Sequence, residues 1–194
     1  MLRVRPIILT SNFTQTVAQL VELGLSCLEN DGDWAEFDSG NGKVGVFIEA
    51  PETEGIELAF EVRDAAIFVR RTLEDGTHAE ETDTSAGPGA RVTAPDGFTF
   101  ELAASEDLSL PEPDADPFAP SSVTAIWRTP DLAAANKVLA DIGAKHVQDY
   151  PGGGALFRAK NGGFVATAKG AVTGVELEIR HQGETLTFGA ESES

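Results

Sequence analysis

The chain has 194 residues, of which 41% are hydrophobic and 24% are charged, a composition typical of a soluble folded protein. Its formal net charge is −18, from 32 acidic and 14 basic residues, and this field repels nucleic acid and anionic membrane surfaces. Acidic surfaces also serve solubility, so the charge alone does not imply a cationic ligand. No apolar run is long enough to span a membrane, and the N-terminus lacks the features of a signal peptide. The single cysteine, Cys27, allows no internal disulfide, and we expect a cytoplasmic protein.

A strand that runs directly into a helix occurs three times along the chain. One copy reads GIELAFEVRDAAIFVRRTLEDG, in which Leu58, Phe60 and Val62 alternate with other residues as in a strand with one buried face. Asp64 then caps a predicted helix, which ends at Gly76.

The same spacing recurs in the other two copies. The distance from capping residue to terminal glycine is twelve positions in each: Asn12 to Gly24, Asp64 to Gly76, and Asp131 to Gly143. Equal spacing with the same polar start and glycine stop predicts an internal repeat.

Three short strands are predicted after each helix, so each repeat is a βαβββ unit. The predicted strands are 25–29, 34–38 and 43–49, then 77–82, 90–94 and 98–103, then 145–149, 155–159 and 164–168. We therefore predict an α+β protein with two paired units at 1–104, an acidic proline-rich linker at 105–121, a third unit with a final strand at 122–180, and a tail at 181–194.

Two phrases in the second unit resemble the vicinal oxygen chelate superfamily, which includes glyoxalase I, bleomycin resistance proteins and extradiol dioxygenases. They are ELAFEVRDAAIFVRRTLEDG, similar to that family's strand and helix, and APDGFTFEL, similar to its closing hairpin. The resemblance implies paired units whose mixed sheets curl around a cleft. It also implies a divalent metal held by a His from the first strand of each unit and a Glu from the last strand of the second.

Carried onto this sequence, those three ligand positions fall on Arg5, Glu57 and Glu101. Only Glu101 matches, and the guanidinium of Arg5 stays protonated and cannot ligate a metal. The third unit has Thr124 and Ala166 at the corresponding positions. We therefore predict no metal, no cofactor and no catalytic residue.

Strand alternation places several polar side chains on the face opposite the apolar set, where they would line the cleft. The predicted ligand-binding residues are Arg5, Trp34, Glu57, Glu61, Thr99 and Glu101. With Arg5 between Glu57 and Glu101, the same side chains could instead form an internal ion-pair cluster that holds the sheets in register. The pattern leaves both roles open and favours either over catalysis.

The predicted function is that of a metal-free protein that binds a small molecule, similar to the bleomycin-resistance branch. The alternatives are a glyoxalase-like lyase or dioxygenase with an atypical metal site that uses Glu101, and a non-catalytic interaction protein with a closed cleft. Three units leave one unpaired, which favours a homodimer. No nucleic-acid or membrane partner is expected.

The remaining candidates are weaker. The histidines His78, His146 and His181 show no ligand spacing, although His146 and His181 could share a site if their strands were neighbours. Cys27 is expected to be a buried, inert thiol, and Trp127 is expected in the core.

Overall fold

The computed structural model describes residues 1–113, 118 and 120–189. The first unit forms sheet 1, in the order β3-β4-β5-β2-β6. Its elements are β2 (Ile7–Thr10), α1 (Phe13–Leu23), β3 (Ser26–Asn30), β4 (Trp34–Asp38), β5 (Lys43–Ile48) and β6 (Gly55–Glu57), with a short 3-10 turn at Pro51–Thr53.

The second unit forms sheet 2, in the order β1-β7-β10-β9-β8, and the third forms sheet 3, in the order β12-β13-β14-β11-β15-β16. Sheet 2 and its helix comprise β1 (Leu2–Val4), β7 (Ala59–Val62), α2 (Ala65–Asp75), β8 (His78–Thr84), β9 (Gly87–Thr93) and β10 (Thr99–Ala104). Sheet 3 and its helix comprise β11 (Ser122–Thr129), α3 (Leu132–Asp141), β12 (Lys145–Asp149), β13 (Ala155–Arg158), β14 (Phe164–Lys169), β15 (Gly174–His181) and β16 (Glu184–Phe188).

The repeat predicted from the sequence is confirmed, because in every unit the first and last strands pair in parallel and the other strand pairs are antiparallel. Asp64 accepts a hydrogen bond from the Ile67 N–H at 3.0 Å, as a capping residue does, and Asp131 caps α3 in the same way. Asn12 stands at the corresponding position of α1 but makes no side-chain capping bond. The terminal glycines all have positive φ, with Gly24 and Gly76 as left-handed caps.

The first strands of units one and two are each divided between two sheets, which the sequence did not predict. Arg5 and Pro6 separate β1 in sheet 2 from β2 in sheet 1, and Leu58 separates β6 in sheet 1 from β7 in sheet 2. The antiparallel register continues across both breaks, since Val4 lies opposite Phe60 and Ile7 opposite Glu57. One two-stranded ribbon therefore connects the two sheets and fixes how they face each other.

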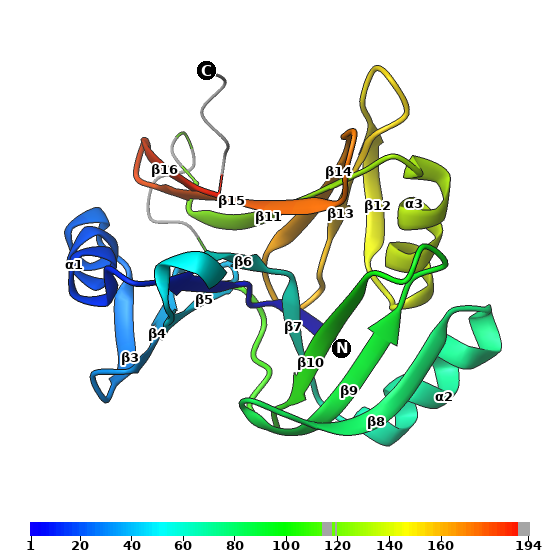
Figure 1. Ribbon diagram of the computed structural model, residues 1–194, viewed down its shortest axis with the longest axis horizontal. Helices are drawn as coiled ribbons and strands as arrows, with labels where there is room; N and C mark the ends of the chain where they lie inside the picture. Colours follow the sequence, from blue (N-terminus) through cyan, green and yellow to red (C-terminus); the bar gives the residue numbers. More distant parts are fainter. Residues whose placement is uncertain (114–117, 119, 190–194) are drawn as a thin grey trace.

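The apolar core includes residues of all three units. Phe60 is fully buried, as the alternation predicted, and so is Trp127, whose side chain is 1% exposed. The Trp127 ring lies 5.1 Å from Phe98 and 6.1 Å from Phe100, centroid to centroid. Figure 1 shows α2 and α3 together on one side of the molecule, with α1 on the opposite side.

The linker and the C-terminal region are more structured than the sequence suggested. Leu108 in the linker is buried, and its carbonyl accepts a hydrogen bond from the Asn161 side chain at 3.2 Å. Strand β16, which begins at Glu184, lies in the segment expected to be a tail and forms a hairpin with β15. Linker residues 114–117 and 119 and tail residues 190–194 lie outside the described part. No helix among the described residues is both long and apolar enough to cross a membrane.

Candidate functional site

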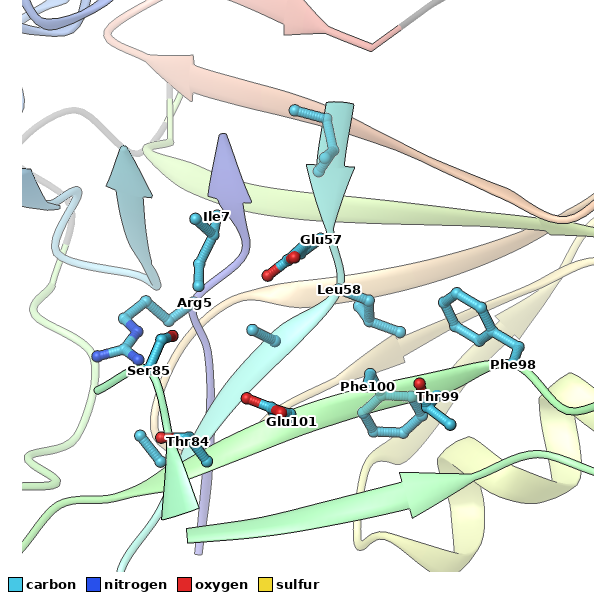
Figure 2. Close-up of a pocket in the computed structure, with 13 residues that line it drawn as sticks. Arg5, Ile7, Glu57, Leu58, Thr84, Ser85, Phe98, Thr99, Phe100 and Glu101 are labelled. Atoms are coloured by element: carbon cyan, nitrogen blue, oxygen red, sulfur yellow. The ribbon is translucent and has the colours of Figure 1, made fainter. Parts of the chain in front are cut away.

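A cleft of about 410 Å³ lies where the ribbon joins sheets 1 and 2. Figure 2 shows Glu57 from β6 and Glu101 from β10 pointing into the same space. Its wall combines three kinds of side chain: the carboxylates of Glu57 and Glu101, the hydroxyls of Thr84, Ser85 and Thr99, and apolar groups including Ile7, Leu58 and Phe98. A volume of this size suits a small organic molecule.

The two carboxylates of the cleft differ in their partners. Arg91 donates to Glu101, with Nη2 3.1 Å from Oε1. Glu57 forms no ion pair and no side-chain hydrogen bond with any other residue that the structure describes, and its side chain is exposed to the cleft. Partial desolvation raises the pKa of Glu57 above its usual value, and the nearby charges of Glu101 and Glu49 add to this effect. The cleft therefore holds one neutralised acid and one free acid.

Beneath the cleft, five charged side chains form what we call the ionic cluster. Its members are Arg3, Arg5, Glu36, Lys43 and Glu61. Arg3 Nε lies 2.8 Å from Glu61 Oε1, and Lys43 Nζ lies 3.2 Å from Glu36 Oε1. Burial alone would raise the pKa of Glu61, but the hydrogen bond from Arg3 and the positive charges of Arg5, Arg3 and Lys43 outweigh it and hold that pKa below its usual value.

The position of Arg5 differs from the prediction that it lies between Glu57 and Glu101. Its Nη1 lies 3.8 Å from Glu61 and 3.9 Å from Glu36 instead, and Figure 2 shows the guanidinium turned away from Glu57 and Glu101 toward Ser85. Arg5 occupies the break between β1 and β2, so the alternation of neither strand sets its direction. An internal ion-pair cluster is present, but it is built on Glu61 and does not include Glu57 or Glu101.

The six predicted cleft residues consequently divide into three groups. Glu57, Thr99 and Glu101 line the cleft, and Arg5 forms its edge. Glu61 is 4% exposed and belongs to the ionic cluster, not to the cleft wall. Trp34 lies in a neighbouring hollow.

That neighbouring hollow, of about 480 Å³, is acidic and aromatic. Trp34 and Phe47 line it together with Asp31 and Glu36, and it shares Arg5 and Ser85 with the cleft. The guanidinium carbon of Arg5 lies 5.7 Å from the centroid of the Trp34 ring, a distance at which a cation and an aromatic ring attract each other. Trp34 therefore contacts the ionic cluster at the rim of the cleft.

Sequence reasoning missed the hydroxyl-bearing tip of the β8–β9 hairpin. The predicted strands 77–82 and 90–94 leave residues 83–89 as the connection, but β8 extends to Thr84, β9 begins at Gly87, and only Ser85 and Ala86 connect them. This tip reaches the space between the two hollows, and Ser85 lines both of them. The strand pattern carried no signal for this contact, because it depends on how far the hairpin extends past sheet 2.

The side chains of the cleft do not fit the divalent metal that the resemblance implies. Glu57 and Glu101 are two carboxylates with an arginine at the third position, and Glu101 is already paired with Arg91. The described residues contain no group of three or more His, Cys, Asp or Glu side chains placed to hold a metal ion. Zinc and iron sites need three or more such ligands, so this donor set suits neither metal.

The weaker candidates also stand apart from the cleft. His146 lies on β12 and His181 on β15, with three strands between them in sheet 3, so they cannot share a site. The nearest polar partner of His146 is Asp149, at 2.8 Å, and that of His181 is Ser121, at 2.8 Å. Cys27 was expected to be buried but is exposed, because β3 lies at the edge of sheet 1.

Solved structures share this fold at low sequence identity. A variant of homoprotocatechuate 2,3-dioxygenase from B. fuscum is 18% identical, with a TM-score of 0.55 over 87% of this chain and 52% of that chain. The 2,3-dioxygenase LapB from Pseudomonas sp. KL28 is 17% identical, with a TM-score of 0.56 over 89% of this chain and 70% of that chain. The Mn(II)-bound glyoxalase from Novosphingobium aromaticivorans is 17% identical, with a TM-score of 0.56 over 87% of this chain and 60% of that chain.

These neighbours are members of the vicinal oxygen chelate superfamily, so the fold predicted from the sequence resemblance is confirmed. The alignment with the B. fuscum dioxygenase spans about half the length of that protein. No protein-family model and no curated protein matches this sequence.

Proposed function

We propose that the cleft between sheets 1 and 2 binds a small organic molecule that carries a basic group, and that it does so without a metal ion. In this proposal the protein is similar to the bleomycin-resistance branch of the superfamily, in that it binds a small molecule and needs no metal. The single observation that supports it best is the carboxylate of Glu57, which enters the cleft and pairs with no cation among the residues that the structure describes. An amine that reaches Glu57 would supply the missing positive charge and form a charge-assisted hydrogen bond.

The rest of the wall suits the body of such a ligand. Ile7, Leu58 and Phe98 offer an apolar surface for a hydrocarbon or aromatic ring, and the hydroxyls of Thr84 and Thr99 can donate to or accept from polar substituents. The nearest arginine to Glu57 in the cleft wall, Arg5, is held by Glu61 and Glu36. A cation in the cleft therefore does not have to displace it.

Benzylamine is a suitable first probe, because it combines one ring with one primary amine. Isothermal titration should show it binding more tightly than benzyl alcohol, which lacks the charge, or benzoate, which reverses it. In the Glu57→Gln protein the affinity for benzylamine should fall roughly tenfold or more, the size of one charge-assisted hydrogen bond. Glu81→Gln makes the same substitution at an exposed position of β8 outside the cleft wall and is the matched control. Equal affinity for the three probes, or no effect of Glu57→Gln, would contradict the proposal.

A glyoxalase-like lyase or a dioxygenase with an atypical metal site is the second candidate, favoured by the fold of the solved neighbours. Elemental analysis and thermal melting with divalent ions separate the two functions. Stoichiometric metal, or melting raised by one ion in the wild type and not in Glu57→Gln, would support the enzyme. We expect neither. The non-catalytic interaction protein requires a closed cleft, whereas a volume of about 410 Å³ remains between the side chains.

A further inference from the structure

We propose that the ligand of the cleft also carries an anionic group, such as a carboxylate, and that Arg5 binds this group. The inference rests on the proposed function, because it names the class of ligand that the same cleft takes. That class is an organic zwitterion, with its basic group at Glu57 and its acidic group at Arg5. A buried guanidinium with unused donors lies on the wall of the same cleft that Glu57 enters, and this juxtaposition supports the inference.

The guanidinium of Arg5 has hydrogen-bond donors that the fold does not use. A guanidinium holds its N–H donors in a fixed fork and has no acceptor. Arg5 is 5% exposed, yet its side chain donates no hydrogen bond to any residue that the structure describes, since the nearest carboxylate oxygens, on Glu61 and Glu36, lie 3.8 and 3.9 Å from Nη1. Its Nε is buried and has no acceptor within the described part of the chain. Buried donors without an acceptor are rare in folded proteins, and an acceptor supplied by a ligand recovers their cost.

The ionic cluster around Arg5 also contains one positive charge more than it has negative charges. Its three cations are Arg3, Arg5 and Lys43, and its two carboxylates are those of Glu36 and Glu61. Arg3 lies 2.8 Å from Glu61 and Lys43 lies 3.2 Å from Glu36, both closer than Arg5 is to either acid. Arg5 is therefore the cation of the cluster with the weakest pairing, and an anion that reached it would balance the cluster.

The anion reaches Arg5 from the cleft and not from the neighbouring hollow. Besides Glu36, the wall of that hollow carries three acids: Glu29, Asp31 and Asp33. Their negative charges would repel an anion that entered there. In the cleft, Arg91 already neutralises Glu101, and the amine of the ligand would neutralise Glu57. A molecule with a carboxylate alone would meet Glu57 uncompensated, so benzoate stays a poor ligand and a zwitterion is favoured.

The spacing of Arg5 and Glu57 suits charges at opposite ends of a small ligand. The Arg5 N–H donates to the Ala59 carbonyl at 3.0 Å, so Arg5 lies opposite Ala59 on the ribbon, diagonally across from Glu57. Diagonal neighbours have Cα atoms roughly 7–8 Å apart. Figure 2 shows the guanidinium turned away from Glu57 toward Ser85, whose hydroxyl can donate to the same anion. The ligand therefore carries its two charges at the ends of a ring or chain and not on one carbon.

A suitable probe is para-(aminomethyl)benzoate, which is benzylamine with a carboxylate at the far end of the ring. Isothermal titration of the full chain should show it binding roughly tenfold or more tightly than benzylamine, the size of one charge-assisted hydrogen bond. Arg5→Lys keeps the charge but loses the fork, so this ratio of affinities should shrink to about threefold or less. Arg70→Lys makes the same substitution at an exposed position of α2 and should leave the ratio unchanged.

Ser85→Ala gives a second readout that leaves the ionic cluster intact, because Ser85 is exposed at the tip of the hairpin. Loss of one neutral hydrogen bond should lower the same ratio roughly threefold. Circular dichroism checks that the variants are folded, and if Arg5→Lys is not, Ser85→Ala decides alone. Equal affinity of the wild type for the two probes, or a ratio that no folded variant lowers, would overturn the inference.

The Glu57→Gln protein separates a failure of this inference from a failure of the proposed function. Both probes should bind it more weakly, but para-(aminomethyl)benzoate should keep its advantage over benzylamine, because that advantage arises at Arg5. Two probes that bind the wild type equally and both weaken in Glu57→Gln would contradict the anion site and leave the amine site standing. A preserved advantage without any effect of Glu57→Gln would contradict the amine site and support the anion site.

Discussion

The cleft and the ionic cluster lie on the same ribbon, yet their glutamates have opposite environments. Glu61, on β7, is buried among Arg3, Arg5 and Lys43, and its pKa is lowered. Glu57, on β6, faces the cleft with no cationic partner in the described part of the chain, and its pKa is raised. Both were predicted to line one cleft, because both belong to the same face of an alternating strand.

The difference shows that the alternation of residues along a strand predicts which face of the sheet a side chain lies on, but not what that side chain does there. Three cations converge on Glu61 because the break at Arg5 and Pro6 lets Arg5 turn beneath the cleft, next to Arg3 and Lys43. The equivalent break at Leu58 brings no cation to Glu57 from among the described residues. An acid that the fold neutralises holds the sheets together, and an acid that it leaves free is available to a ligand.

The largest expected effect is on stability, and it separates the two acids. Replacing Glu61 with glutamine would leave Arg5 and Lys43 with Glu36, and Arg3 with no acidic partner among the described residues, in a buried environment. We expect Glu61→Gln to lower the free energy of unfolding by about 3 kcal/mol, as is typical when one member of a buried ion pair is removed. Urea unfolding followed by circular dichroism measures this change.

Glu57→Gln is the matched control for that experiment, since it makes the same substitution on the same ribbon. With no ion pair to lose within the described structure, its free energy of unfolding should change by less than about 0.5 kcal/mol. Equal losses for Glu57→Gln and Glu61→Gln would remove the distinction between cleft and cluster.

The pH dependence of stability sharpens the same comparison. The folded-state pKa of Glu61 lies below the usual value of 4.5, so its carboxylate stabilises the protein above that pH, and this contribution is lost as the pH falls through the folded pKa. The folded-state pKa of Glu57 lies above 4.5, so ionising it destabilises the fold as the pH rises from there through the folded pKa.

The two variants should therefore diverge in opposite directions. Relative to wild type, Glu61→Gln becomes less stable as the pH rises above the folded pKa of Glu61, whereas Glu57→Gln becomes slightly more stable as the pH rises above 4.5. Urea midpoints measured in steps between acidic and neutral pH test this divergence. Parallel curves would mean that the two carboxylates share one environment after all.

The sequence predicted the parts of this protein that depend on local order. The helix starts at Asp64 and Asp131 and the stops at Gly24 and Gly76 follow from capping chemistry, and the buried face of Phe60 follows from the period of a strand. These features need no knowledge of distant residues.

The direction of Arg5 and the split of its strand between two sheets could not be obtained in this way. They depend on pairing with a segment some fifty residues away, which creates a bend where a single strand was expected. The same limit applies to Ser85, whose place in the cleft is set by the reach of a hairpin. Local patterns specify elements, whereas the site is built where elements from different units meet.

The smallest expected effect concerns the rim, where Trp34 joins the ionic cluster to the neighbouring hollow. The Trp34 ring lies over Gly45, and a Cβ added at Gly45 would clash with Cη2 of that ring. Gly45→Ala should push the ring outward and weaken its contact with Arg5, at a cost of about 1 kcal/mol or less in the free energy of unfolding, because the end of the side chain can move.

Tryptophan fluorescence measures this movement. Since Trp127 is 1% exposed, any red shift of the emission and any gain in acrylamide quenching must come from Trp34. Trp34→Phe isolates the Trp127 signal, and an unchanged spectrum in Gly45→Ala would show that Trp34 does not rest against the sheet. If the spectrum shifts while stability holds, the ionic cluster keeps Arg5 in place without the ring, and Trp34 is free to contact a ligand at the rim.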